Sequence, residues 1–173
     1  MTVDVDHPEE EAAMANDALS DIEQFFSAYL KATGDGTIFK PGQDVLEIGD
    51  AIHYDHQADT VRKAIEARTG TPLESADEGL VSGGAECDAA VAWWRQGEAG
   101  LNDTLVQLRD ECLRENGYVL LITPAEGQDG HWSDADLRNA GHQVGMGNLG
   151  KKGPYKPEGA SWVASILIRQ QQH

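Results

Sequence analysis

The stretch Tyr118–Thr123, YVLLIT, is the clearest strand in the sequence, an unbroken run of aromatic, aliphatic and β-branched residues that ends at Pro124. A second apolar run, Asp44–Gly49 (DVLEIG), follows the turn signal Pro41-Gly42. Short continuous apolar runs bounded by turn residues are typical of strands that are buried on both faces of a sheet. The two stretches therefore predict the centre of a sheet that helices cover on both sides.

Helical and strand patterns alternate along the rest of the chain. Leu101, Leu105, Leu108 and Cys112 fall on one face of a long helix, which is expected to end near Gly117. The other predicted elements are a helix over about 58–69, strands over 72–75 and 88–94, a helix over 133–140, and strands over 143–146 and 162–169. Strands that alternate with amphipathic helices indicate an α/β sandwich with a mainly parallel sheet.

Charge is distributed unevenly along the chain. The whole sequence carries 30 acidic and 13 basic side chains, a net charge of −17, and residues 1–30 contribute eight acids and no base. Residues 1–15 lack aromatic anchors, which predicts an acidic disordered tail. Leu19, Ile22, Phe26 and Tyr29 then recur at helical spacing. We therefore expect a tail over 1–15, an N-terminal helix and linker over 16–39, and the α/β domain over 40–173.

Composition excludes several classes of protein. A net charge of −17 argues against duplex nucleic acid and membrane surfaces as partners, because both require clustered Lys and Arg. No apolar run approaches the roughly 18 residues of a membrane span, and the acidic N-terminus does not resemble a secretory signal. Cys87 and Cys112 lack metal-ligand spacing, which favours reduced thiols in a cytoplasmic protein. Cys112 lies on the apolar helix face and is expected to be buried and inert.

Polar residues follow the first predicted strand, and ligands in doubly wound folds bind beyond the carboxyl ends of strands. The loop GDAIHYDH over 49–56 puts Gly49, Asp50 and His53 at that edge. His53 and His56, with a neighbouring aspartate, carry the atoms needed to ligate a metal. Histidines three apart on a polar loop are more often solvated, and no third ligand is fixed by the spacing, so we predict no metal site.

The segments after two later strands are expected at the same edge. Asp129 and His131 follow YVLLIT and form a candidate acid/base pair, with Arg95 placed to meet an anion. The structural alternative is that Asp129 and Gly130 simply make a turn before the next helix, since no serine or cysteine nucleophile with a local signature accompanies them. Core packing is the favoured role of the Trp93 and Trp94 rings. The predicted ligand-binding residues are Gly49, Asp50, His53, Trp94, Arg95, Thr123, Asp129 and His131, and the catalytic candidates are His131, Asp129 and Arg95.

A glycine-rich stretch precedes the last strand. Gly145–Gly150 (GMGNLG) matches the letters of a dinucleotide fingerprint, which requires a strand before it and a helix after it. The following Lys151–Pro157 (KKGPYKP) is incompatible with a helix. We therefore expect a loop over 145–157 rather than a phosphate-binding motif. A second role stays open for this loop, in which its three lysines close over an anion.

Val45–Gly49 and Gly117–Pro124 resemble, respectively, the first motif and a later central strand of the S-adenosylmethionine-dependent methyltransferases. The resemblance implies a Rossmann-like three-layer sandwich. The methyltransferase motif continues with one or two further glycines, where this chain has Asp50-Ala51-Ile52-His53. The cofactor motif is therefore incomplete, so we expect no cofactor, and S-adenosylmethionine is the candidate to test against that expectation.

A closer resemblance, over about 39–140, is to an actinobacterial family of small acidic proteins known as domain of unknown function 3052. The residues that carry it are Lys40–Gln43, Ala64–Ala67, Thr69–Thr71, Trp93–Arg95, Leu121–Pro124, Gly127 and Asp129–His131. The segment after about Gly141 and the extended N-terminal helix depart from the family pattern. The family implies a methyltransferase-like cytoplasmic domain and supplies no catalytic residues to transfer.

The motifs leave three hypotheses for function. The first is a non-catalytic methyltransferase-like domain that binds a protein or a small ligand. The second is a divergent enzyme, either an S-adenosylmethionine-dependent methyltransferase or a metal-assisted hydrolase, with its site at the carboxyl edge of the sheet. The third is an oligomeric interaction module, in which Trp93, Trp94 or Trp162 and the N-terminal helix bury against another copy of the chain to form a homo-oligomer.

Overall fold

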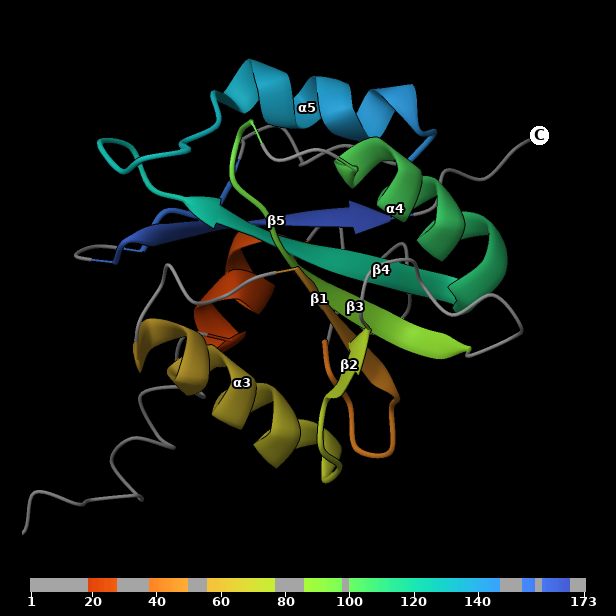
Figure 1. Cartoon of the computed structure of the whole chain (residues 1–173). Helices are drawn as coiled ribbons and strands as arrows, with labels where there is room; N and C mark the ends of the chain where they lie inside the picture. The colour runs from red at the N-terminus through yellow and green to blue at the C-terminus, as the bar shows by residue number, and fades with distance from the viewer. Residues whose placement is uncertain are drawn as a thin grey trace, which may run out of the picture.

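A five-stranded mixed sheet forms the centre of the molecule (Figure 1). The computed structural model describes residues 19–27, 38–49, 56–76, 86–97, 100–146, 154–157 and 160–168. The strands are β1 (Val45–Gly49), β2 (Glu74–Ala76), β3 (Cys87–Trp93), β4 (Leu113–Pro124) and β5 (Trp162–Ile168). They lie in the order β2-β1-β3-β4-β5, and β5 alone runs antiparallel to its neighbour. The predicted mainly parallel sheet is confirmed.

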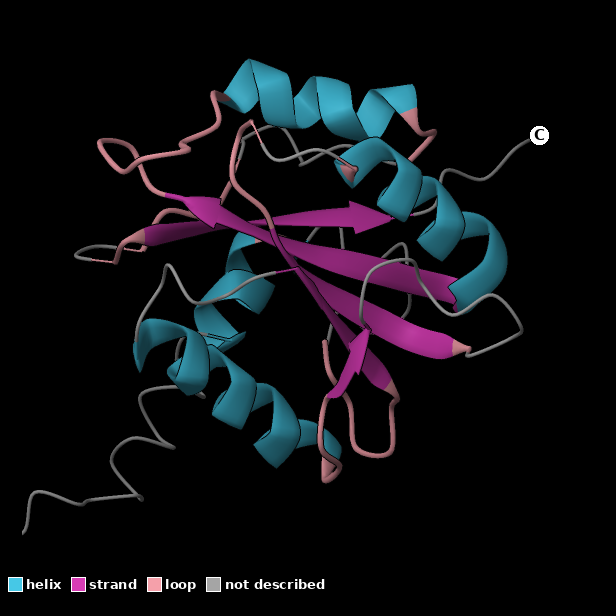
Figure 2. Ribbon diagram, viewed as in Figure 1, coloured by secondary structure: helices cyan, strands magenta, loops and turns pink. Residues whose placement is uncertain are grey.

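Helices cover both faces of this sheet, so the predicted three-layer Rossmann-like sandwich is also confirmed (Figure 2). Helix α3 (His56–Thr69) lies on one face, and α4 (Leu101–Gln107), the π-helical turn η3 (Leu108–Cys112) and α5 (Asp134–Gln143) lie on the other. Alternate residues of β4 supply the two cores: Leu120 and Ile122 point toward α3, whereas Val119 and Leu121 point toward α4 and α5. Among the described residues, no helix is long and apolar enough to cross a membrane.

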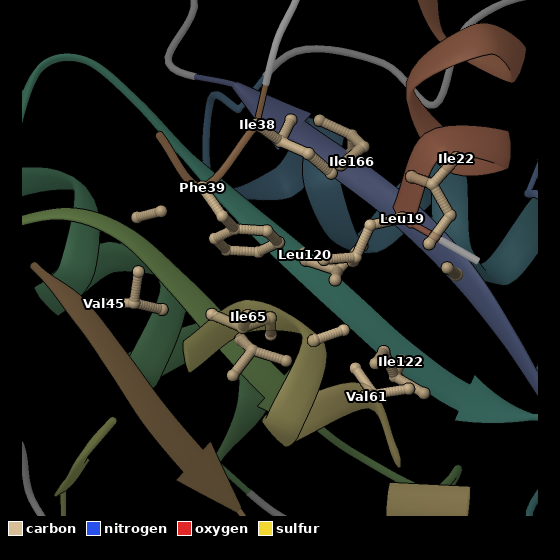
Figure 3. Packing of buried hydrophobic residues seen from close by; sticks show 14 of the residues in the cluster. Leu19, Ile22, Ile38, Phe39, Val45, Val61, Ile65, Leu120, Ile122 and Ile166 are labelled. Carbon is tan, nitrogen blue, oxygen red and sulfur yellow. The ribbon is translucent and has the colours of Figure 1, made fainter. Parts of the chain in front are cut away.

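Residues 19–27 complete the α3 face. Leu19 and Ile22 are buried in the same apolar cluster as α3, and Figure 3 shows them beside Ile166 of β5. The Glu23 carboxylate pairs with Arg68 at the end of α3 and accepts a hydrogen bond from the Ile38 backbone N–H. The predicted helical spacing of Leu19 and Ile22 is confirmed. The division of the chain into parts over 1–15, 16–39 and 40–173 stays a prediction, since residues 1–18 and 28–37 lie outside the described residues.

The tryptophans are covered within this chain. Trp93 and Trp162 are buried in the α3-side core, and Trp94 is buried in the core beneath α4 and α5. The favoured prediction of core packing for Trp93 and Trp94 is therefore confirmed. These are also the side chains that the oligomer hypothesis invoked, and each is already packed inside one copy of the protein.

The predicted helix from Leu101 ends earlier than expected. It passes through the π-helical turn and stops at Cys112, and β4 begins at Leu113 rather than at Tyr118. Leu113 pairs with Cys87, and the register then shifts by a bulge before Tyr118 pairs with Ala89. Gly117 permits this irregular strand start, because a Cβ there would lie 2.8 Å from the Arg114 carbonyl oxygen. Strand pairing at Leu113 therefore overrides the helical pattern.

The predicted strand over 143–146 is wrong, because α5 occupies the first of these positions and then ends in a glycine cap. Gly145 has φ +69°, and its N–H donates to the His142 carbonyl at 3.1 Å. The Met146 N–H donates to the Gly141 carbonyl at 3.0 Å. These two bonds form the Schellman motif that ends helices at a left-handed glycine. The first glycine of GMGNLG is thus a helix cap, consistent with the prediction that the stretch is no dinucleotide fingerprint.

Candidate functional site

The carboxyl ends of β1 and β3 meet where the direction of the strand order reverses. In the sheet, β2 lies on the outer side of β1, and β4 lies on the opposite side, next to β3. The chain therefore leaves β1 and β3 in opposite directions, which makes this the topological switch point of the sheet. Gly49 at the end of β1 pairs with Trp93 at the end of β3 and has φ +93°. An added Cβ on Gly49 would overlap the Trp93 carbonyl oxygen, so only glycine fits there. Asp50 and His53 lie outside the described residues, as does the side chain of His56.

A buried carboxylate stabilises the switch point from the α3 side. Trp93 Nε1 donates to Glu47 Oε2 at 3.1 Å, and Glu47 also forms an ion pair with Arg62 of α3. The Arg62 guanidinium carbon lies 5.9 Å from the centroid of the Trp93 ring. Partial burial lowers the pKa of Arg62, but hydrogen bonds and charge interactions with Glu47 and, to a smaller extent, Asp59 together raise the pKa above its ordinary value. Sequence analysis did not single out Glu47; a charged residue inside a two-faced buried strand was the available signal.

The loop between β4 and α5 folds back over the end of β3. The Gln96 N–H donates to the Gly130 carbonyl at 2.8 Å, and the Gln96 side chain donates to Asp136 of α5 at 3.0 Å. An added Cβ on Gly130 would lie 2.7 Å from Arg95 Cβ, so the two residues are in close contact. Arg95 Nη1 lies 3.9 Å from a carboxylate oxygen of Asp129. The structure thus brings together three of the predicted site residues, Arg95, Asp129 and His131, on one loop cluster.

His131 is held in a defined orientation within this cluster. Its Nδ1 atom lies 3.0 Å from the Pro124 carbonyl oxygen, and its backbone N–H donates to the Gln128 carbonyl at 3.2 Å. Because a carbonyl oxygen only accepts, Nδ1 carries the proton in this contact. In the neutral imidazole, Nε2 is then the acceptor. The ring is half-buried, so His131 has one structural nitrogen and one that is able to accept a hydrogen bond.

Thr123 lies deeper than the other candidates. Its side chain is fully buried, and its Oγ1 makes no hydrogen bond within the described structure. Ser165 Oγ and Trp132 Nε1 are also buried atoms that make no hydrogen bond within the described structure. The sequence pattern singled out neither of these residues. Trp94 is also buried, whereas Gly49, Arg95, Asp129 and His131, the other predicted ligand-binding residues in the described structure, have exposed surface.

Neither cysteine is prepared for nucleophilic chemistry. Cys87 and Cys112 are free thiols, and both are buried. Burial, with smaller contributions from Cys112 and Asp88, raises the pKa of Cys87 to about 12. Burial also raises the pKa of Cys112, followed by the charge of Glu111. The expectation that Cys112 is buried is confirmed. Within the described ranges, no group of three or more His, Cys, Asp or Glu side chains is placed to hold a metal ion.

The glycine- and lysine-rich loop is described only at its ends. Lys156 lies 3.6 Å from the Asp134 carboxylate in the first turn of α5. Tyr155 forms a bridge with Ala164, which covers the outer edge of β5. Lys151 and Lys152 lie outside the described residues. Closure of the loop over an anion therefore stays a prediction.

Comparison with known proteins identifies related sequences. The family model described as Protein of unknown function (DUF3052) matches residues 35–171. Curated relatives include "Uncharacterized protein Rv2239c" of Mycobacterium tuberculosis and "Uncharacterized protein Mb2263c" of Mycobacterium bovis, each 34% identical over 118 residues. The matched region covers 64% of this chain and 63% of each relative, so the chain spans less than two thirds of the length of these proteins.

Solved structures with a similar fold are methyltransferases. A SAM dependent methyltransferase from Aquifex aeolicus is 14% identical, with a TM-score of 0.49, over 82% of this chain and 89% of that chain. The magnesium protoporphyrin IX methyltransferase of Synechocystis PCC 6803 with bound SAH is 13% identical, with a TM-score of 0.48, over 98% and 90% of the two chains. At this level, the likeness concerns the fold and is not evidence for a shared ligand or reaction.

Proposed function

The chain belongs to the family described as Protein of unknown function (DUF3052), and on that premise we propose that it is a non-catalytic, methyltransferase-like domain that binds a small anionic ligand at the carboxyl edge of its sheet. The observation that carries the proposal is the joint anchoring of Arg95 and His131 by the β4–α5 loop, beside the switch point. Ligands in open α/β sheets bind at this position.

The chemistry of the cluster favours a carboxylate or a phosphate. Arg95 presents a guanidinium whose side chain is 29% exposed, and the planar fork of arginine matches both anions. The fixed Nδ1 contact orients the His131 ring at the same loop. The Asp129 carboxylate near Arg95 is fully exposed, so a ligand anion is able to displace it at low cost, because exposed ion pairs contribute about 0–1 kcal/mol.

Binding without catalysis is supported by how the reactive groups are used. Glu47 is engaged by Arg62 and Trp93, and both thiols are buried with raised pKa values. Among the described residues, no hydrogen bond joins Asp129 to His131, so this carboxylate does not orient the imidazole as the third group of an activated nucleophile and base would. Glu47 and His131 therefore hold the sheet edge and the loop in place, and the two thiols are buried.

Isothermal titration calorimetry tests the proposal. Propyl phosphate and butyrate are the probes, and we expect at least one to bind the wild-type chain and to bind Arg95→Gln about tenfold or more weakly, as loss of a charge-assisted hydrogen bond predicts. Arg138→Gln is the matched control, since Arg138 is exposed on α5. S-adenosylmethionine and its demethylated product are expected to give no heat. Micromolar binding of either cofactor form, or equal affinities in wild type and Arg95→Gln, would contradict the proposal.

The second candidate function, a divergent enzyme, is favoured by one observation. The Nδ1 contact of His131 with Pro124 leaves Nε2 as an acceptor, the arrangement of an oriented general base. His131→Asn distinguishes the two functions in assays for methyl transfer from S-adenosylmethionine and for ester hydrolysis. Turnover by the wild-type chain that His131→Asn abolishes would establish the enzyme, whereas binding of propyl phosphate without turnover would leave the binding domain as the better account.

A further inference from the structure

Three buried polar atoms of the α4/α5 side make no hydrogen bond within the described structure. They are Thr123 Oγ1, Ser165 Oγ and Trp132 Nε1. The Thr123 and Ser165 side chains are fully buried. Unpartnered buried polar groups are uncommon in folded proteins, because each has lost its hydrogen bonds with water without replacement. Three of them on one side of a sheet therefore require an explanation.

The sheet register places Thr123 and Ser165 on the same face of the sheet as neighbouring residues. β4 and β5 are antiparallel, with Leu121 opposite Ser165 and Thr123 opposite Val163. Residues 121 and 123 share one face of β4, and Leu121 belongs to the core beneath α4 and α5. Ser165 lies on that same face because it is directly opposite Leu121. Thr123 and Ser165 are therefore diagonal neighbours, a separation of roughly 7–8 Å or less across a sheet.

Trp132 reaches the same layer from the β4–α5 loop. Its side chain packs against the core beneath α4 and α5, and the next residue, Ser133, caps α5. The contact between His131 Nδ1 and the Pro124 carbonyl at 3.0 Å ties this part of the loop to the end of β4, directly after Thr123. Thr123 and Trp132 are therefore direct chain neighbours of the two residues joined by this contact, and Ser165 is diagonal to Thr123 in the sheet.

We propose that Thr123 Oγ1, Ser165 Oγ and Trp132 Nε1 form an inner subsite that recognises a hydroxyl group of the ligand, and that the ligand class is a hydroxylated phosphate ester. This inference rests on the proposed function, since Arg95 would hold the anionic end. The donor set determines the class: an indole N–H only donates, whereas the threonine and serine hydroxyls both donate and accept. A ligand hydroxyl has two acceptor lone pairs and one donor, so it accepts from Trp132 and from one of the two protein hydroxyls and donates to the other, and one small group satisfies all three atoms.

Recognition by such a subsite is selective. A site built to hydrogen-bond a ligand hydroxyl rejects the analogue that lacks it, because the buried protein groups are then left unpaired. Glycerol 3-phosphate and propyl phosphate form a matched pair of probes, with the same anion and chain length but with and without hydroxyl groups. The subsite therefore predicts a difference in affinity between the two, and this difference is separate from the anion affinity that Arg95 supplies.

Calorimetric titration of the full chain with both probes tests the inference. The wild-type chain is expected to bind glycerol 3-phosphate about tenfold or more tightly than propyl phosphate. Thr123→Val and Ser165→Ala should each remove most of this preference by weakening the binding of glycerol 3-phosphate. Thr104→Val is the matched control, a half-buried threonine on α4 that should keep the preference. Thr123→Ser, which keeps the hydroxyl, should also keep it and shows that the Thr123→Val effect is not a folding defect.

The outcomes separate this inference from the proposed function. Equal wild-type affinities for the two probes, with binding still lost in Arg95→Gln, would overturn the hydroxyl subsite and leave the anion site standing. A preference that survives both Thr123→Val and Ser165→Ala would show that the three atoms serve structural water only, and would also overturn it. If neither phosphate binds the wild-type chain but butyrate does, the subsite is overturned and the anion site stands. If butyrate fails to bind as well, the proposed function fails and the subsite fails with it.

Discussion

The two faces of the sheet differ in whether their buried polar groups have hydrogen-bond partners. On the α3 face, buried Glu47 pairs with Trp93 and Arg62, the buried Tyr118 hydroxyl accepts the Phe39 N–H, and half-buried Glu23 pairs with Arg68. On the α4/α5 face, Thr123, Ser165 and Trp132 carry polar atoms without hydrogen bonds in the described structure. Satisfied buried polar groups stabilise the fold, and in the proposal above the unsatisfied groups of the second face are kept for a ligand.

The largest effect is expected at Glu47. Glu47→Leu leaves the buried Trp93 indole N–H without the Glu47 acceptor and leaves Arg62 with its ion pair to the exposed Asp59. We expect a loss of about 2–3 kcal/mol in the free energy of unfolding, with the Arg62 contribution reduced because that side chain is one-third exposed. Urea denaturation measures this loss, with Glu111→Gln as the exposed control. A loss as small as that of the control would show that Glu47 does not stabilise the α3 face.

A smaller effect is expected at Tyr118. Its hydroxyl accepts the Phe39 N–H at 2.7 Å, and Phe39 is a buried non-glycine residue with φ +53°. Tyr118→Phe leaves that N–H unpaired beside a strained residue, so the free energy of unfolding should fall by about 1–2 kcal/mol. Tyr155→Phe is the matched control, since its hydroxyl makes only an exposed contact of 3.4 Å with Asp21. The same denaturation series measures both, and equal losses would contradict the difference in burial.

The smallest effect on stability is expected at Thr123. Unlike the two substitutions above, Thr123→Val is not expected to lower the free energy of unfolding. Thr123→Val removes a buried hydroxyl that has no partner in the described structure. Replacing such a group with an apolar one of the same shape should be neutral or should stabilise the protein by up to about 1 kcal/mol. Thermal and urea denaturation without ligand measure the change. A clear destabilisation would show that Thr123 is a structural residue and would erase the contrast between the two faces.

The apolar runs of the sequence predicted the sheet well, because short continuous runs such as YVLLIT and DVLEIG are typical of strands that are buried on both faces. Element ends were harder to predict. The helical spacing of Leu101, Leu105, Leu108 and Cys112 is real, but the pairing of Leu113 with Cys87, 26 residues earlier in the chain, decides where the helix stops. Such pairing is a tertiary contact that no local pattern contains. Gly145 illustrates the same limit. It begins a stretch whose letters match a dinucleotide fingerprint, whereas its backbone conformation ends α5.

The candidate site was partly predictable from the sequence. Arg95, Asp129 and His131 follow two strands that end at one edge of the sheet, so their proximity follows from topology alone. The partners of Glu47 were not predictable, because Arg62 and Trp93 lie 15 and 46 residues away in sequence. Ser165 and Trp132 carry no motif, and their importance appears only when burial and hydrogen bonds are known. The roles of Gly49, Asp50 and His53 stay predictions.

The most direct test of the account follows the indole N–H signals in two-dimensional ¹H–¹⁵N spectra while glycerol 3-phosphate is added. The chain has four tryptophans, and Trp132→Phe and Trp162→Phe spectra assist assignment. The account predicts that the Trp132 indole signal shifts with the backbone signals of Gln96 and Gly130, while the Trp93 indole signal, bound to Glu47, stays in place. A shift of Trp93 with Trp132 unchanged, or no shift at either, would contradict it.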